Sequence, residues 1–195
     1  MTLRVAVADT LTLDGGTCAG AGTLAIAGAL AWPDGELAGG GTTVVQAGGS
    51  ATIGSASGSP SLGDDRSFVN AGHTTVSAGT LAVSGSGTLG SGAALAMSGG
   101  TLDLGTTSQT VGATTITAAA ASGNTIQNGT LTPSSLTASN SSGNAIVAAG
   151  IAGTGGVTVS GAGTLTLSGS NSYTGATTVN AGTLALSGTY TGGGA

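Results

Sequence analysis

Residues 161–188 read GAGTLTLSGSNSYTGATTVNAGTLALSG and contain the clearest internal repeat of the chain. One phrase, Gly-Thr-Leu-x-Leu-x-Gly, occurs twice in it, at residues 163–169 and 182–188. In an extended chain the two leucines of each copy point to one face, and the small residues between them point to the other. A strand with one narrow apolar edge is not stable alone, so the copies are expected to stack on each other.

Related phrases recur along the whole chain at nearly constant spacing. Close copies occupy residues 22–28 and 79–85, and looser ones occupy residues 10–15, 95–99 and 101–105. Leu165 lies 19 residues before Leu184, Leu81 lies 21 before Leu102, and Leu24 lies 20 before Val44. Such repeats suit parallel strands that stack at about 4.8 Å with like side chains in ladders.

The sequence therefore predicts an all-β fold without helices over one domain, residues 1–195. The expected architecture is a single-stranded parallel β-helix, or β-solenoid, with about 20 residues per coil and about ten coils. Residues 54–67 are predicted to form a loop because they are rich in Gly, Ser and Pro. Residues 118–121, four alanines after a β-branched run, are predicted to form a tight inner strand.

Composition supports this prediction and excludes several classes of protein. Gly, Ala, Ser and Thr fill 129 of the 195 positions, and charged residues make up only 5%. Disorder usually requires more charge, and collagen requires a Gly-X-Y period that is missing. With Arg4 and Arg66 as the only cationic side chains besides His73, no nucleic-acid partner is expected. No stretch is apolar enough for a transmembrane segment, and residues 1–13 lack the apolar core of a signal peptide.

Residues 161–188 resemble the autotransporter-associated β-strand repeat, also called the passenger-associated transport repeat, of Gram-negative autotransporters and adhesins. The elements that carry the resemblance are Gly-x-Gly-Thr-Leu-x-Leu-x-Gly, Asn-x-Tyr-x-Gly and Thr-x-Val-x-x-Gly-x-Leu. Residues 66–85 match more loosely, and residues 32–37 resemble a related adhesin coil motif. The motif positions, all expected to be structural, are Gly163, Thr164, Leu165, Leu167, Gly169, Asn171, Tyr173, Gly175, Thr177, Val179, Gly182, Leu184 and Leu186.

The resemblance implies a right-handed β-helix, exported across the outer membrane and displayed outside a Gram-negative cell or secreted. It also implies a structural or adhesive role without catalysis, in which the repeats assist secretion and form a stalk. The expected partners are a host surface, a glycan or a second copy. An outer-membrane translocator barrel, which such passengers use for export, is not found in this chain, and neither is a signal peptide. The chain is therefore expected to be a fragment or a truncated passenger.

One charged cluster keeps an alternative open, namely a carbohydrate-binding or polysaccharide-cleaving β-helix. Asp64, Asp65, Arg66 and His73 are close in sequence and could supply carboxylates and a base on an outer loop. Adjacent aspartates diverge in an extended chain, however, so a solvated loop is the plainer interpretation. Trp32 could stack on a sugar ring, or it could pack in an end coil beside Leu30 and Leu37.

We expect no catalytic, cofactor or metal-binding residues. The GxGxxG match at residues 85–90 is followed by no helix, and a Walker loop needs a lysine that the chain lacks. One His and one Cys cannot form a zinc site unaided, and no aspartate ladder suggests a calcium-binding β-roll. The single cysteine, Cys18, is expected to be a small buried residue.

A third hypothesis is ice binding through a regular threonine array. It is suggested by the pairs Thr10/Thr12, Thr115/Thr117, Thr130/Thr132 and Thr164/Thr166. The hypothesis requires such a pair on every coil of one face. The corresponding positions of other copies hold Thr80/Ala82, Thr101/Asp103 and Thr183/Ala185, which interrupt the array.

Overall fold

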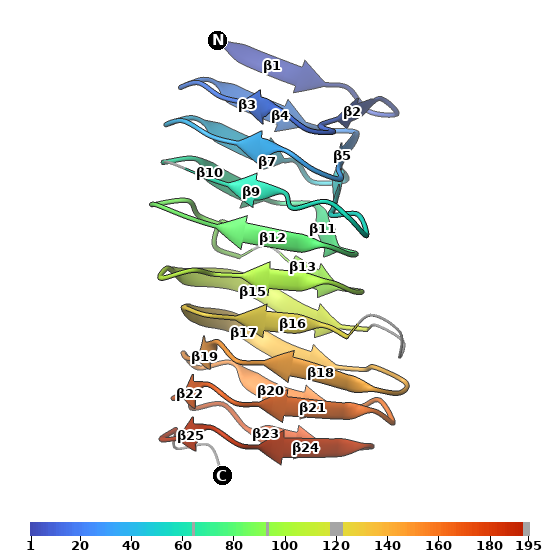
Figure 1. Ribbon diagram of the computed structural model, residues 1–195, viewed down its shortest axis with the longest axis vertical. Coiled ribbons are helices and arrows are strands. Elements are labelled where there is room, and N and C mark those ends of the chain that lie inside the picture. Colours follow the sequence, from blue (N-terminus) through green and yellow to red (C-terminus); the bar gives the residue numbers. More distant parts are fainter. Residues whose placement is uncertain (64, 93, 118–122, 193–195) are drawn as a thin grey trace.

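The computed structural model describes residues 1–63, 65–92, 94–117 and 123–192. In these ranges the chain forms 25 strands, and every strand pairing is parallel. The strands stack along one axis, from the N-terminus at one end of the molecule to the C-terminus at the other (Figure 1). No helix is present among the described residues, so the predicted all-β solenoid is confirmed.

Each coil contributes strands to three faces, which we number in chain order. The first face holds β1 (Thr2–Val5), β4 (Thr23–Ile26), β7 (Thr42–Val45), β10 (Ser67–Asn70), β19 (Gly150–Ile151), β22 (Ser170–Asn171) and β25 (Thr189–Tyr190). The second face holds β2 (Thr10–Thr12), β5 (Ala29–Trp32), β8 (Ser50–Ile53), β11 (His73–Val76), β13 (Ala94–Met97), β20 (Gly156–Val159) and β23 (Thr177–Val179). Two long strands, β15 (Ser108–Ile116) and β17 (Thr130–Ala138), begin on the first face and continue along the second.

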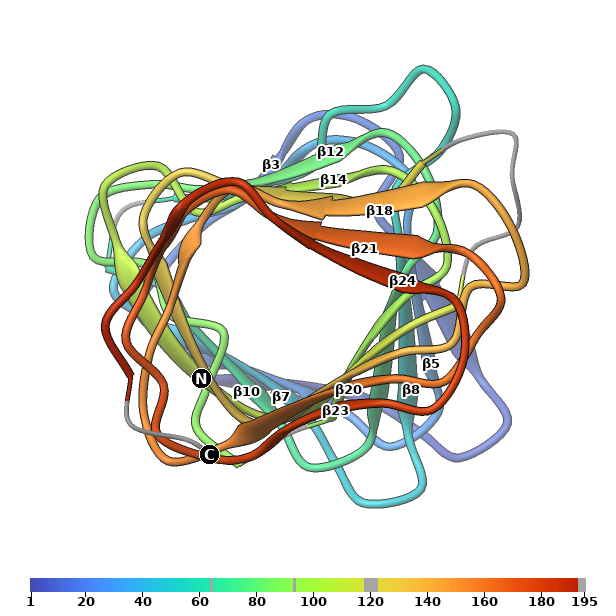
Figure 2. The same cartoon turned by 90° about the horizontal axis from the view of Figure 1, so that it is seen from below.

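The third face is the most regular. It holds β3 (Thr17–Cys18), β6 (Glu36–Leu37), β9 (Ser61–Leu62), β12 (Thr80–Val83), β14 (Thr101–Asp103), β16 (Thr125–Gln127), β18 (Asn144–Val147), β21 (Thr164–Leu167) and β24 (Thr183–Leu186). In Figure 1 these strands lie in front and run from right to left. The second-face strands β20 and β23 lie behind and run from left to right, whereas β5 and β8 lie at the side, as Figure 2 shows. Because the chain descends from N to C, the winding is right-handed, and Figure 2 shows the coils superposed along the axis.

The coils number about nine and contain about 21 residues each, close to the predicted values. The number of residues per coil varies more than the spacing of the sequence repeats suggests. Thr42 stacks on Ser67, whereas Thr164 stacks on Thr183, so the coil that begins at Thr42 is the longer one. The extra residues lie within 54–66. This segment, predicted to be a loop, contains β9, which pairs with β6 and β12 between two turns.

The core forms because inward-pointing and outward-pointing side chains alternate along each strand. On β21 the side chains of Leu165 and Leu167 are fully buried, and those of Thr164 and Thr166 are half-buried on the outside. Leu165 pairs with Leu184 and Leu81 pairs with Leu102, as their spacing predicts. Since the inner coils bury corresponding positions, one continuous apolar column fills the solenoid.

The predicted pairing of Leu24 with Val44 is wrong by one residue. Leu24 pairs with Thr43, and Val44 pairs with Ala25. Because side chains alternate between faces, this shift turns Thr43 into the interior and Val44 to the outside. Inside the solenoid the Thr43 hydroxyl accepts a hydrogen bond from Arg66 Nε at 3.1 Å.

Candidate functional site

The charged residues proposed for sugar cleavage do not form a common site. Asp64 lies outside the described residues. Asp65 is exposed on the turn before β10 and accepts a hydrogen bond from the Ser86 hydroxyl. His73 is exposed at the start of β11, where Nε2 lies 3.2 Å from the Thr75 hydroxyl. No interaction among the described residues joins Asp65, Arg66 and His73.

Trp32 lies in the core and cannot stack on an external sugar. Its side chain is 1% exposed, and its ring is stacked on Phe68 with centroids 6.4 Å apart. The indole N–H donates to the Gly35 carbonyl oxygen at 3.1 Å, which satisfies its polar atom at the turn after β5. Trp32 is therefore a packed core residue, as the second of its two interpretations proposes.

Arg66 points inward, although it was expected on a solvated loop. Its side chain is only 3% exposed. Nε donates to Thr43 Oγ1, and Nη1 donates to the carbonyl oxygens of Gly20 and Ala38 at 3.1 and 3.3 Å. The sequence does not indicate this orientation. Arg66 lies between a turn and β10, so the alternation of buried and exposed residues along that strand does not extend to it.

The paired threonines behind the ice-binding hypothesis lie on different faces. Two pairs lie on the second face: Thr10/Thr12 on β2, and Thr115/Thr117 at the end of β15, with Thr117 just beyond the strand. Thr130/Thr132 lie on the first-face part of β17. Thr164/Thr166 lie on the third face. These four pairs therefore form no single array.

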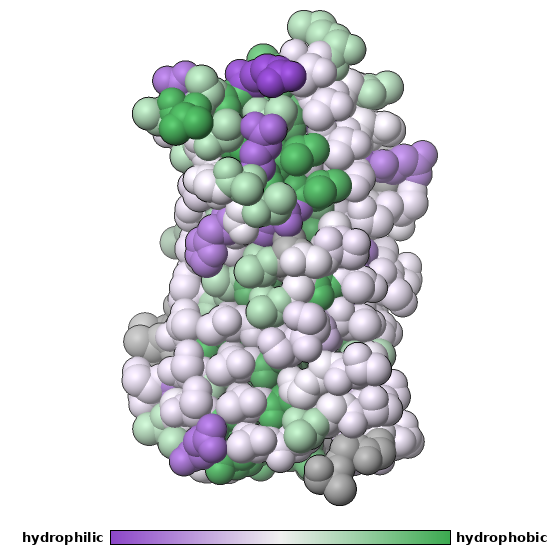
Figure 3. Space-filling view, turned by 180° about the vertical axis from the view of Figure 1, so that it is seen from behind, coloured by the Kyte–Doolittle hydropathy of each residue, from purple (hydrophilic) through white to green (hydrophobic). Residues whose placement is uncertain are grey.

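A different array, which sequence reasoning missed, runs along the second face. One outward position of that face forms a continuous column, which we call the second-face column. It consists of Thr12, Ala31, Thr52, Thr75, Ala96, Thr115, Thr137, Thr158 and Thr178. Finding it requires the register of every coil, which varying coil lengths conceal. Seen from behind, the C-terminal half of the molecule, where β20 and β23 of this face lie, is mostly covered by residues of intermediate hydropathy (Figure 3).

A second row of hydroxyls closes the corner after the second face. Ser77, Ser98, Thr117, Ser139 and Ser160 each donate to a backbone carbonyl of the preceding coil, at 3.3 to 3.5 Å. The backbone N–H of each residue donates to the same carbonyl oxygen. These hydroxyls bind successive coils together, whereas the second-face column faces outward.

The motif residues of 161–188 serve the stack. Asn171 is buried, and its amide N–H groups donate to the carbonyls of Gly169 and Thr189 while its oxygen accepts from the Ile151 N–H. It therefore connects three successive coils. Leu184 is half-buried, and Val179 and Leu186 are exposed in the last described coil. Asn180 has an exposed side chain.

Tyr173 gives this repeat a pH dependence that can be measured. Its ring is buried, its hydroxyl lies 2.8 Å from Thr177 Oγ1, and the Tyr190 ring is 5.1 Å away. Burial raises the pKa of Tyr173 above its ordinary value of 10.0. The hydrogen bond with Thr177 opposes this shift, and the nearby Tyr190 adds a smaller increase. The folded protein therefore retains the phenol proton at a pH where the unfolded chain has lost it.

We expect the free energy of unfolding to fall as pH rises above about 10, because the unfolded state then binds fewer protons than the folded state. In Tyr173→Phe this contribution should be absent, so the stability difference between the two proteins should change with pH in that range. Denaturant unfolding from pH 8 to 12, with tyrosinate absorbance as a second readout, measures both effects. A difference that stays constant through this range would contradict the assignment.

Other kinds of site find no support in the described ranges. No group of three or more His, Cys, Asp or Glu side chains is close enough there to hold a metal ion. No described helix has the length and apolarity of a membrane span. Cys18 is half-buried against the core and forms no disulfide.

Comparison with protein families gives one match. The model of the passenger-associated transport repeat matches residues 70–83 and 157–186. The longer match runs from β20 to the end of β24, and the shorter one from the end of β10 to the end of β12. The resemblance inferred from residues 161–188 is thereby confirmed. Comparison with curated proteins found no match, and comparison with solved structures found none either.

Proposed function

We propose that this chain is a structural and adhesive segment of an autotransporter-type passenger, displayed on or secreted from a Gram-negative cell, and that it has no catalytic role. The observation that carries the proposal is the transport-repeat match over residues 157–186. These residues form stacked coils with buried Leu165, Leu167 and Tyr173. The repeat is therefore a unit of the solenoid itself.

The mechanism follows from the way in which the coils stack. Each coil contacts mainly its neighbours, so a completed coil offers paired edges and an apolar row on which the next coil can fold. Folding that proceeds coil by coil outside the cell would oppose backward movement of the chain and so support export. Asn171 and Tyr173, which lie within the matched residues, contact Thr189 and Tyr190 of the following coil.

The outer surface is suited to contact rather than to chemistry. The second-face column presents hydroxyl and methyl groups with few charges, and residues 104–195 contain no charged side chain. Such a surface can form hydrogen bonds with a host glycan or with a second copy at little desolvation cost. The dispersal of Asp65, Arg66 and His73 supports a role without catalysis.

The test compares two deletions that each remove one coil while keeping the strand register. Thr164 stacks on Thr183, so removing residues 164–182 deletes a coil within the matched repeat. Thr130 stacks on Gly150, so removing residues 130–149 deletes a coil outside it. The chain would be placed between a signal peptide and a translocator barrel, and its display measured by antibody labelling and by proteinase K digestion of intact cells.

We expect deletion of residues 164–182 to reduce display several-fold, and deletion of residues 130–149 to reduce it much less. The reason is that only the first deletion removes the repeat associated with transport. Equal display of both variants and the intact chain would refute a role in export.

A further inference from the structure

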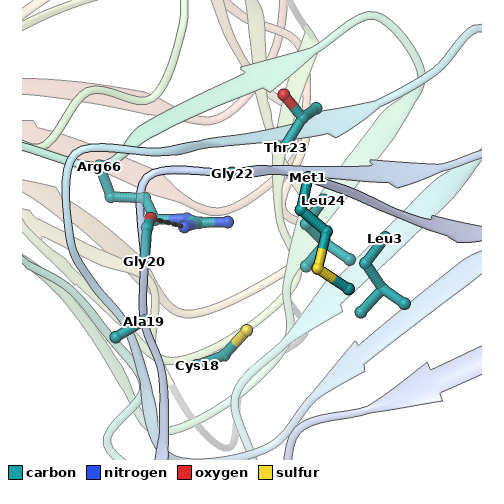
Figure 4. Close-up of a pocket in the computed structure, with 9 residues that line it drawn as sticks. All are labelled: Met1, Leu3, Cys18, Ala19, Gly20, Gly22, Thr23, Leu24 and Arg66. Carbon is teal, nitrogen blue, oxygen red and sulfur yellow. Dashed lines mark hydrogen bonds between the residues drawn. The ribbon is translucent and has the colours of Figure 1, made fainter.

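The buried guanidinium of Arg66 lies at one side of a pocket near the N-terminal end of the solenoid. The pocket has a volume of about 290 Å³, and its walls include Met1, Leu3, Leu24 and Cys18. In Figure 4 the guanidinium points across this space toward Met1, Leu3 and Leu24, and the Cys18 thiol points into the same space. A cation thus shares a small cavity with mainly apolar groups.

Among the described residues, the guanidinium has no negatively charged hydrogen-bond partner. Its three hydrogen bonds within the described ranges use Nε and Nη1 and go to a hydroxyl and two carbonyls, all uncharged. Neither N–H group of Nη2 donates to a described residue. A buried positive charge with only neutral acceptors carries a desolvation cost that an anion in contact with it would offset.

The backbone around Arg66 holds it in this orientation. A Cβ added at Gly41 would lie 2.7 Å from Nη1, so a side chain at that position would compete with the guanidinium for space. Thr43, turned inward by the register of β7, fixes Nε from the other side. The donors of Nη2 are therefore held in place before any ligand arrives.

We propose that this pocket binds a small organic anion, a monocarboxylate with a short aliphatic tail. The planar guanidinium matches a carboxylate through directed, charge-assisted hydrogen bonds. The aliphatic tail would lie against Met1, Leu3 and Leu24 and remove apolar surface from water. Inorganic phosphate fits less well, since it would lose its hydration against these apolar walls and gain no apolar contact there.

Cys18 offers a direct readout because it is the only cysteine and lines the pocket. The experiment measures alkylation of Cys18 by iodoacetamide in the intact chain, by mass spectrometry, with hexanoate, hexanol or inorganic phosphate present. A dissociation constant of about 1 mM for hexanoate would slow alkylation about tenfold at 10 mM. Hexanol and phosphate at the same concentration should slow it much less. Equal protection by hexanol would refute the role of the charge, and equal protection by phosphate would refute the role of the apolar walls.

Two variants that remove one positive charge each then test Arg66. Arg66→Gln should abolish protection by hexanoate, and Arg4→Gln, which changes an exposed arginine on β1, should retain it. Protection that survives in folded Arg66→Gln, as judged by circular dichroism, would overturn the proposal. If that variant does not fold, the comparison of hexanoate with hexanol and phosphate on the unaltered chain decides the question. None of these outcomes depends on export, so the pocket and the proposed function can fail separately.

Discussion

Leu136→Ala is expected to lower the free energy of unfolding by about 2–5 kcal/mol, the usual cost of truncating a fully buried leucine. Leu136 is 0% exposed and lies in the middle of β17 between Thr114 of β15 and Val157 of β20. Each coil of a solenoid packs directly on the coil before it and the coil after it, so a cavity at Leu136 weakens the packing against both. Urea unfolding followed by circular dichroism measures the change.

The matched control is the next residue on the same strand. Thr137 points outward in the second-face column, and Thr137→Ala should change the free energy of unfolding by no more than about 0.5 kcal/mol. The contrast between adjacent positions tests the alternation itself. Equal effects of the two substitutions would mean that β17 does not bury one side only, and the assigned register would be wrong.

The fold follows from the sequence because its signal is repeated. The same apolar alternation occurs in many coils, so an error in one phrase does not change the conclusion. Leu165 pairs with Leu184 and Leu81 pairs with Leu102, as their spacing predicts. The error at Leu24 has a local cause. Arg66 provides Thr43 with a buried partner, and a pattern that counts only apolar residues shifts the register to Val44.

The candidate sites were less predictable because they depend on where coils of unequal length bring residues together. The partners of Arg66 are Thr43, Ala38 and Gly20, which belong to other coils. Proximity in sequence instead grouped Arg66 with Asp65 and His73, from which the strand geometry separates it. The second-face column was hidden for the same reason, since its members follow one another at changing intervals.

Glycine has a second role that composition alone does not reveal. One role is to provide the positive φ that a tight corner requires, as Gly35 does with φ of 90°. Other glycines have ordinary φ values but lie where one coil touches the next. A Cβ at Gly175 would lie 2.5 to 2.6 Å from the backbone of Gly155 and Gly156. At such positions the absence of a side chain sets the distance between coils.

Gly175→Ala is therefore expected to destabilise the protein by about 1–3 kcal/mol, because the added methyl group forces two backbones apart. Gly40→Ala is the matched control: no atom lies within 4 Å of its added Cβ and its φ is not positive. Gly40→Ala lowers the conformational entropy of the unfolded chain, so the free energy of unfolding should stay the same or rise by up to about 1 kcal/mol. Urea unfolding of both variants tests the opposite signs. If Gly175→Ala were as stable as the unaltered chain, the close contact between coils at this motif position would be refuted, and the abundance of glycine would have to be explained by corner geometry alone.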